Sequence, residues 1–190
     1  MKNIVLLGAP RSGKSTFSRI LLNNFCNYNI IQGDIIRQLY SFIQYNNPVS
    51  MKGSTATVVI NKEDIKNMIR YFFESSIECE PDLRFILETC DLKIKDACKY
   101  ARKGYIVIAF EYPDITVEQG VENLEKYDTI KDWTYIESPF KKKMFISSYI
   151  AESKYWEKNC KKHGIKFVNT KGDRNKIFSE LLEWVKENIE

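Results

Sequence analysis

The chain has 190 residues and a net charge of +4, with 44% hydrophobic and 28% charged residues. This length fits one domain with a core of its own, and the composition is that of an ordinary globular protein. The basic residues are dispersed along the chain, which fits a small anionic ligand and argues against nucleic acid as a partner.

No apolar run approaches the roughly 18 residues that a membrane-spanning helix needs. The apolar segment after Met1 is too short for a signal peptide. The five cysteines show no C-x-x-C spacing, so we expect reduced thiols. These features together predict a cytoplasmic protein with no membrane segment.

The first predicted elements are a buried strand over residues 3–7 and an amphipathic helix that follows residue 15. The residues between them match the pattern Gly-x4-Gly-Lys-[Ser/Thr], in which backbone N–H groups at a helix N-terminus bind phosphate. Lys14 would reach the β- and γ-phosphates, and the Ser15 hydroxyl would ligate Mg²⁺. The alternative is a purely structural tight turn. The predicted nucleotide-binding residues are Gly8, Arg11, Ser12, Gly13, Lys14, Ser15 and Thr16.

A second strand over residues 30–33 leads directly into the sequence Gly-Asp-Ile-Ile-Arg. This spacing places Asp34 at the carboxyl end of the strand and Arg37 one helical turn later on the same face. Asp34 can accept the proton of an attacking hydroxyl, and the Arg37 guanidinium can bind a phosphate or carboxylate of an acceptor. The alternative is that Asp34 only caps the helix and that Arg37 is exposed.

Strand and helix patterns alternate along the rest of the chain, which predicts a three-layer α/β fold with a five-stranded parallel sheet and helices on both faces. Residues 1–190 form one domain in this interpretation. Two stretches interrupt the rhythm: 47–82, predicted to be an acceptor-binding insertion, and 112–141, predicted to be a lid. The remaining predicted strands span 84–88, 105–110 and 165–168, and the remaining predicted helices span 34–45, 63–79, 92–103, a short segment after Thr116, 142–162 and a last helix after Asp173.

Two carboxylates end strands at the predicted ligand-binding edge. Glu88, with Asp91 shortly after it, takes the place of a carboxylate that holds Mg²⁺ through water, and the alternative is capping of the strand end. Glu111 ends the most apolar strand, where a buried partner or a plain surface residue is favoured over a site role.

The chain resembles the P-loop small-molecule kinases, which include adenylate, shikimate, gluconate and adenylylsulfate kinases. It shares with them the phosphate-loop pattern, the Gly-Asp-x-x-Arg element and the position of the predicted lid. The resemblance implies ATP and Mg²⁺ as cofactors and a small-molecule acceptor, in a monomer or homodimer. It assigns Lys14 and Ser15 to Mg·ATP and Asp34 to the acceptor. The predicted catalytic residues are Lys14, Asp34 and Arg37. The predicted metal ligands are Ser15 and Glu88.

The chain departs from nucleotide-phosphorylating relatives because it has no arginine between residues 103 and 173. Arg11 and the cluster Lys141–Lys143 are the candidates to replace the missing lid arginines. This shortage favours a small hydroxyl compound as acceptor. A nucleoside or nucleotide kinase comes second, then a nucleotide-dependent switch, then a polynucleotide 5′-hydroxyl kinase. The switch has support only from the string Asn-Lys-Glu-Asp at 61–64, which we interpret as a helix start.

Overall fold

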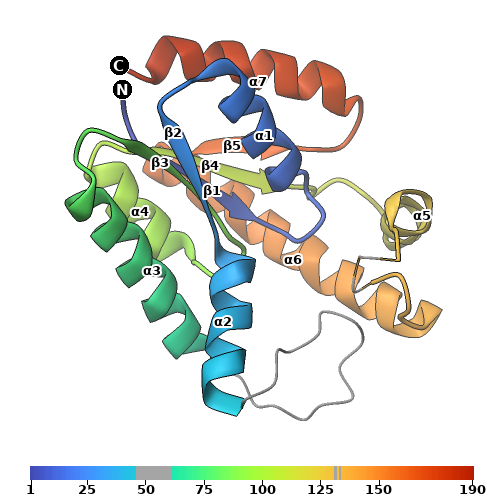
Figure 1. The fold of residues 1–190 in the computed structure, drawn as a ribbon. Helices are drawn as coiled ribbons and strands as arrows, with labels where there is room; N and C mark the ends of the chain where they lie inside the picture. The colour runs from blue at the N-terminus through green and yellow to red at the C-terminus, as the bar shows by residue number, and fades with distance from the viewer. Residues whose placement is uncertain (46–60, 131, 133) are drawn as a thin grey trace.

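The structure, a computed structural model, describes residues 1–45, 61–130, 132 and 134–190. Five parallel strands form one sheet in the order β2-β3-β1-β4-β5 (Figure 1). The predicted five-stranded parallel α/β fold is therefore confirmed. The strands are β1 (Ile4–Gly8), β2 (Tyr28–Gln32), β3 (Arg84–Glu88), β4 (Ile106–Glu111) and β5 (Lys166–Asn169).

Helices cover both faces of the sheet, as the apolar runs require. Alternate residues of β1 face opposite sides: Val5 and Leu7 join one apolar cluster, and Ile4 and Leu6 join the other. The first cluster is covered by α3, α4 and α6, and the second by α1 and α7, so the molecule has three layers (Figure 1). The helices are α1 (Lys14–Asn24), α2 (Gly33–Tyr45), α3 (Lys62–Cys79), α4 (Ile94–Arg102), α5 (Val117–Tyr127), α6 (Pro139–His163) and α7 (Arg174–Asn188).

The helix starts follow their capping residues. Thr116 and Gln119 form the predicted capping box of α5, and Asp173 accepts hydrogen bonds from two backbone N–H groups at the start of α7. Helix α6 begins at Pro139, three residues before the predicted Lys142, because Ser138 caps it and proline suits the first helical position.

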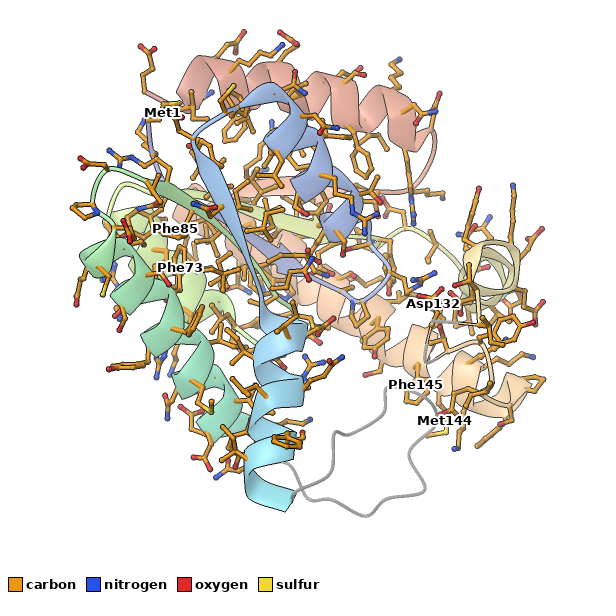
Figure 2. All side chains as sticks on the ribbon, in the orientation of Figure 1. Met1, Phe73, Phe85, Asp132, Met144 and Phe145 are labelled. Carbon is orange, nitrogen blue, oxygen red and sulfur yellow. The ribbon has the colours of Figure 1, made fainter. Side chains whose placement is uncertain are left out.

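The predicted acceptor-binding insertion is only partly visible, because residues 47–60 lie outside the described residues. Asn61 caps α3 by accepting a hydrogen bond from the Glu63 N–H, so the Asn-Lys-Glu-Asp string is a helix start here. Helix α3 buries Ile69 and Phe73 in the core, and Figure 2 shows Phe73 and Phe85 together where this helix covers the sheet. The described part of the insertion therefore contributes to the core of the domain.

Among the described residues, no helix combines the length and apolarity that crossing a membrane requires.

Candidate functional site

The phosphate loop links β1 to α1, and its two glycines occupy positions that other residues could not. Gly8 has φ 122°, and a Cβ atom there would lie 2.1 Å from the carbonyl oxygen of Phe110 on β4. Gly13 has φ 97° and is the N-cap of α1. The loop thus approaches the neighbouring strand closely and then opens directly onto a helix N-terminus.

Positive charge gathers at this helix N-terminus. Lys14 is buried, and its Nζ donates to the carbonyl oxygens of Gly8 at 2.9 Å and Ala9 at 2.7 Å. The first turn of α1 contains no acidic residue that would neutralise the positive end of the helix dipole. The Ser12 hydroxyl oxygen is fully buried in the loop and has no hydrogen-bond partner among the described residues. Thr16 is exposed beside Ser15. Such a loop can bind an anion.

Glu88 faces the phosphate loop from the end of β3. The Ser15 hydroxyl donates to Glu88 Oε1 at 2.5 Å, and the Ser18 hydroxyl lies 3.5 Å from Glu88 Oε2. Pairing of β1 with β3 brings these residues together across the sheet. A hydroxyl and a carboxylate are oxygen ligands of the kind that Mg²⁺ takes. These oxygen atoms are of the kind that would hold a magnesium ion, and the assignment of Ser15 and Glu88 as the metal pair stays a prediction.

We expect Glu88→Gln to weaken Mg²⁺ binding in the nucleotide complex by about 10- to 100-fold, the usual cost of losing a metal-supporting carboxylate. Titration of Mg²⁺ into the nucleotide complex, followed calorimetrically, measures this. Glu183→Gln, an exposed change on α7, serves as the matched control and should leave the affinity unchanged. An unaltered Mg²⁺ affinity in Glu88→Gln would remove Glu88 from the metal set.

Asp34, Arg37 and Asp91 form an ion-pair chain at the same edge of the sheet. Arg37 Nη1 lies 2.9 Å from Asp34 Oδ1, and Arg37 Nη2 lies 2.5 Å from Asp91 Oδ2. Asp34 is in the first turn of α2, which begins at Gly33, and its side chain is 53% exposed. The alternative of an exposed Arg37 is wrong, because both of its terminal nitrogens are bound by carboxylates. Arg37 fixes the orientation of Asp34 while leaving that carboxylate open to solvent.

The segment 112–141, predicted to be a lid, contacts the phosphate loop through the carboxylates of Asp128 and Asp132. Arg11, which has φ 64°, lies 2.6 Å from both Asp128 Oδ1 and Asp132 Oδ1. The Asp128 side chain is 1% exposed and also accepts a hydrogen bond from the Thr134 hydroxyl. Figure 2 labels Asp132 in the segment that leads from α5 to α6. Arg11 thus joins the loop to the lid segment, and phosphate binding by Arg11, a prediction of the sequence, requires it to leave these partners.

We expect Arg11→Ala and Asp128→Ala each to lower the free energy of unfolding by about 1–3 kcal/mol, below the cost of breaking a fully buried pair because Arg11 is one-third exposed. The double variant should lose less than the sum of the two, because the two changes remove one interaction. Urea unfolding of the four proteins measures this. Strictly additive losses would show that the pair does not hold the lid segment to the loop.

The lysines proposed to replace lid arginines lie at the start of α6. Lys141 Nζ lies 3.0 Å from Glu137 Oε2, within the same segment, and Lys142 is buried. Their role toward a transferred phosphoryl group stays a prediction.

Sequence reasoning gave two residues near the phosphate loop no site role. Asp128 was predicted only as part of the lid segment 112–141, and no local sequence pattern indicates the ion pair that it makes with Arg11. Glu111 is fully buried at the end of β4, so the surface interpretation is wrong. Its place as the last residue of a strand with an apolar sequence, at the edge that carries the phosphate loop, was the signal available for it.

No protein-family model matches the sequence, and no curated protein is similar enough to it to be matched. Solved structures do match over nearly the whole chain. A shikimate kinase from Acinetobacter baumannii, in complex with shikimate, has 14% identity and a TM-score of 0.59, with 99% of this chain and 94% of that chain covered.

A gluconokinase from Sinorhizobium meliloti has 14% identity and a TM-score of 0.58, over 98% of this chain and 92% of its own. A deoxyadenosine kinase from M. mycoides with bound dATP has 14% identity and a TM-score of 0.51, over 97% of this chain and 99% of its own. The chain therefore has the P-loop small-molecule kinase fold, as the sequence motifs indicated.

Proposed function

We propose that this chain, which has the fold of the P-loop small-molecule kinases, is an ATP-dependent phosphotransferase that moves the γ-phosphoryl group of ATP to a hydroxyl of a small acceptor. The observation that carries the proposal is the gathering of three groups at one edge of the sheet: the buried Lys14 in the phosphate loop, the Ser15–Glu88 pair, and the oriented carboxylate of Asp34. An anion site, a metal pair and a base are the parts that phosphoryl transfer requires.

The transfer step assigns one task to each group. The acceptor hydroxyl oxygen bonds to the γ-phosphorus of ATP, the bond to the bridging oxygen breaks, and ADP leaves with that electron pair. Asp34 takes the proton of the attacking hydroxyl, and Arg37 holds the carboxylate in place through the 2.9 Å ion pair. Lys14 and the N-terminal N–H groups of α1 stabilise the negative charge of the transferred group.

Magnesium, when bound by Ser15 and Glu88 with the phosphates, would neutralise part of their negative charge. Among the protein groups, Lys14 binds phosphate oxygens, and Asp34 acts on the acceptor side. The two sides of the reaction therefore depend on different residues, and single substitutions can separate them.

ADP release from Mg·ATP across an acceptor panel tests the proposal, with the Lys14→Ala protein as the blank. The panel spans nucleosides, nucleotides, sugar acids, amino-alcohols and 5′-hydroxyl oligonucleotides. Strong stimulation of ADP release by one class is the expected result. A slow hydrolysis that no acceptor changes would favour a nucleotide-dependent switch instead, and stimulation by the oligonucleotides alone would favour a polynucleotide kinase.

A further inference from the structure

Glu111 is a buried carboxyl at the end of β4, next to the residue that pairs with the phosphate loop, and the transfer step described above does not use it. Its side chain has no solvent exposure. Strand register pairs Phe110 with Gly8, and the Ala9 N–H donates to the Phe110 carbonyl at 3.2 Å. Glu111 therefore follows the residue of β4 that the loop approaches most closely.

The carboxyl has fewer partners than a buried charge requires. Glu111 Oε2 accepts a hydrogen bond from the Ser153 hydroxyl at 2.6 Å, whereas Oε1 is buried and has no hydrogen-bond partner among the described residues. Ionisation of a carboxyl that is buried away from water with one oxygen unpaired is costly, and this cost favours the neutral acid. Burial accordingly raises the pKa of Glu111 to about 7.

The groups around Glu111 come from the phosphate loop and from helices α1 and α6. The Ser153 hydroxyl, the Lys14 charge and the main chain of Ala9 lower the pKa of Glu111 and so favour its ionised form, and Glu152 on α6 raises that pKa. Burial raises the pKa values of two further neighbours, Tyr112 and Cys160, well above neutrality, so both stay neutral in the range where Glu111 titrates.

Tyr112 ties this buried group to the loop. Its N–H lies 3.3 Å from the Ser153 hydroxyl oxygen, and its own hydroxyl donates to the carbonyl of Pro10 in the loop at 3.1 Å. The residues on both sides of Glu111 therefore contact the phosphate loop, and the carboxyl shares its electrostatic surroundings with Lys14.

We propose that Glu111 is a positioning residue of the phosphate loop whose carboxyl takes up a proton when a nucleotide's phosphates bind there. The ionised carboxylate attracts the Lys14 ammonium and repels the phosphates. The neutral acid does neither, so the Lys14 ammonium can bind the phosphates without competition from Glu111. By linkage, nucleotide affinity falls as Glu111 ionises. This inference rests on the proposed nucleotide site, and its test separates the two.

The test is calorimetric titration of a non-hydrolysable ATP analogue with Mg²⁺, in buffers of different ionisation enthalpy, for the wild-type protein and Glu111→Gln. If phosphate raises the pKa of Glu111 by one unit, the wild type takes up roughly half a proton more than the variant at pH 7.5. Wild-type affinity should then fall up to about tenfold from pH 6 to pH 9 relative to the variant. The ATP analogue also gains and loses protons over this pH range, but it does so equally with both proteins, so this contribution cancels in the comparison.

Two further variants fix the sign of the effect. Ser153→Ala removes a hydrogen bond that favours the ionised form, so it should move the fall in affinity to higher pH. Glu152→Gln removes a neighbouring negative charge and should move the fall to lower pH.

Stability provides a check on the buried group itself. The pKa of Glu111 lies above its ordinary value of 4.5 in the folded protein, so ionisation destabilises the fold as pH rises from that value and does so fully above pH 7. The urea midpoint of Glu111→Gln should match the wild type at pH 4.5 and exceed it at pH 8.

Identical proton uptake and identical pH dependence in the wild type and Glu111→Gln would overturn the inference while leaving the proposed function standing. Proton release by the wild type relative to the variant would also overturn it. Failure of the wild type to bind any nucleotide would overturn the proposed function and this inference with it.

Discussion

Replacing Lys14 by alanine should lower acceptor-dependent turnover by on the order of 10² to 10³, the loss seen when one preorganised donor to a charged transition state is removed. Lys14 is buried in the loop, and its ammonium already lies within hydrogen-bond distance of the Gly8 and Ala9 carbonyls. Phosphate oxygens that enter the loop would draw this ammonium to themselves. The measurement is kcat and KM for ATP at saturating acceptor.

The matched control is Lys176→Ala on α7, whose side chain is 75% exposed. It should leave both constants unchanged. Lys14→Arg should not restore turnover, because a planar guanidinium does not replace a compact ammonium within a tight loop. Full activity in Lys14→Ala would show that Lys14 does not stabilise the transferred phosphoryl group.

Replacing Asp34 by asparagine should lower turnover by about 10²- to 10⁴-fold, the usual contribution of a positioned general base. Nucleotide affinity should change little, because Asp34 lies on α2 and its ion pair among the described residues is with Arg37. Asparagine has nearly the same shape but cannot accept the hydroxyl proton. Single-turnover rates and equilibrium binding of the ATP analogue, measured on the same protein, separate the two effects.

Asp91→Asn is the informative comparison for Asp34. It loosens Arg37 from the other side and leaves the proposed base intact, so it should cost less turnover than Asp34→Asn. A large loss of nucleotide affinity in Asp34→Asn would contradict its placement on the acceptor side.

The local parts of this site could be predicted from the sequence because they depend on short spacings. The loop from Gly8 to Ser15 is defined by glycines at fixed positions between a strand and a helix. Asp34 and Arg37 are three residues apart on one helix, so their ion pair follows from helical geometry. Glu88 was placed from the rule that strand ends of a parallel sheet face one ligand site.

The contacts that hold these parts together could not be predicted, because they join residues far apart in the chain. Arg37 and Asp91 are separated by 54 positions, and Arg11 and Asp132 by 121. Glu111 meets Ser153 across 42 positions, from the end of a strand to the middle of a helix. Such pairings depend on how α2, α5 and α6 pack on the sheet. The identity of a single residue does not indicate which distant residue it will contact.

The start of α6 is a different case, because the sequence does contain a local pattern that marks it. Ser138 followed by Pro139 is a cap and a first helical residue, and the structure begins the helix there. Apolar periodicity alone placed that start three residues too late.

The measurement that tests phosphoryl transfer most directly follows the γ-phosphoryl group itself. Phosphorus NMR of the wild-type protein with Mg·ATP and the acceptor panel should show a new phosphomonoester resonance for one acceptor class. It should grow at the rate at which ADP appears, and it should be missing with Lys14→Ala. Inorganic phosphate as the sole product with every acceptor, at an unchanged rate, would contradict the assignment of this chain as a kinase.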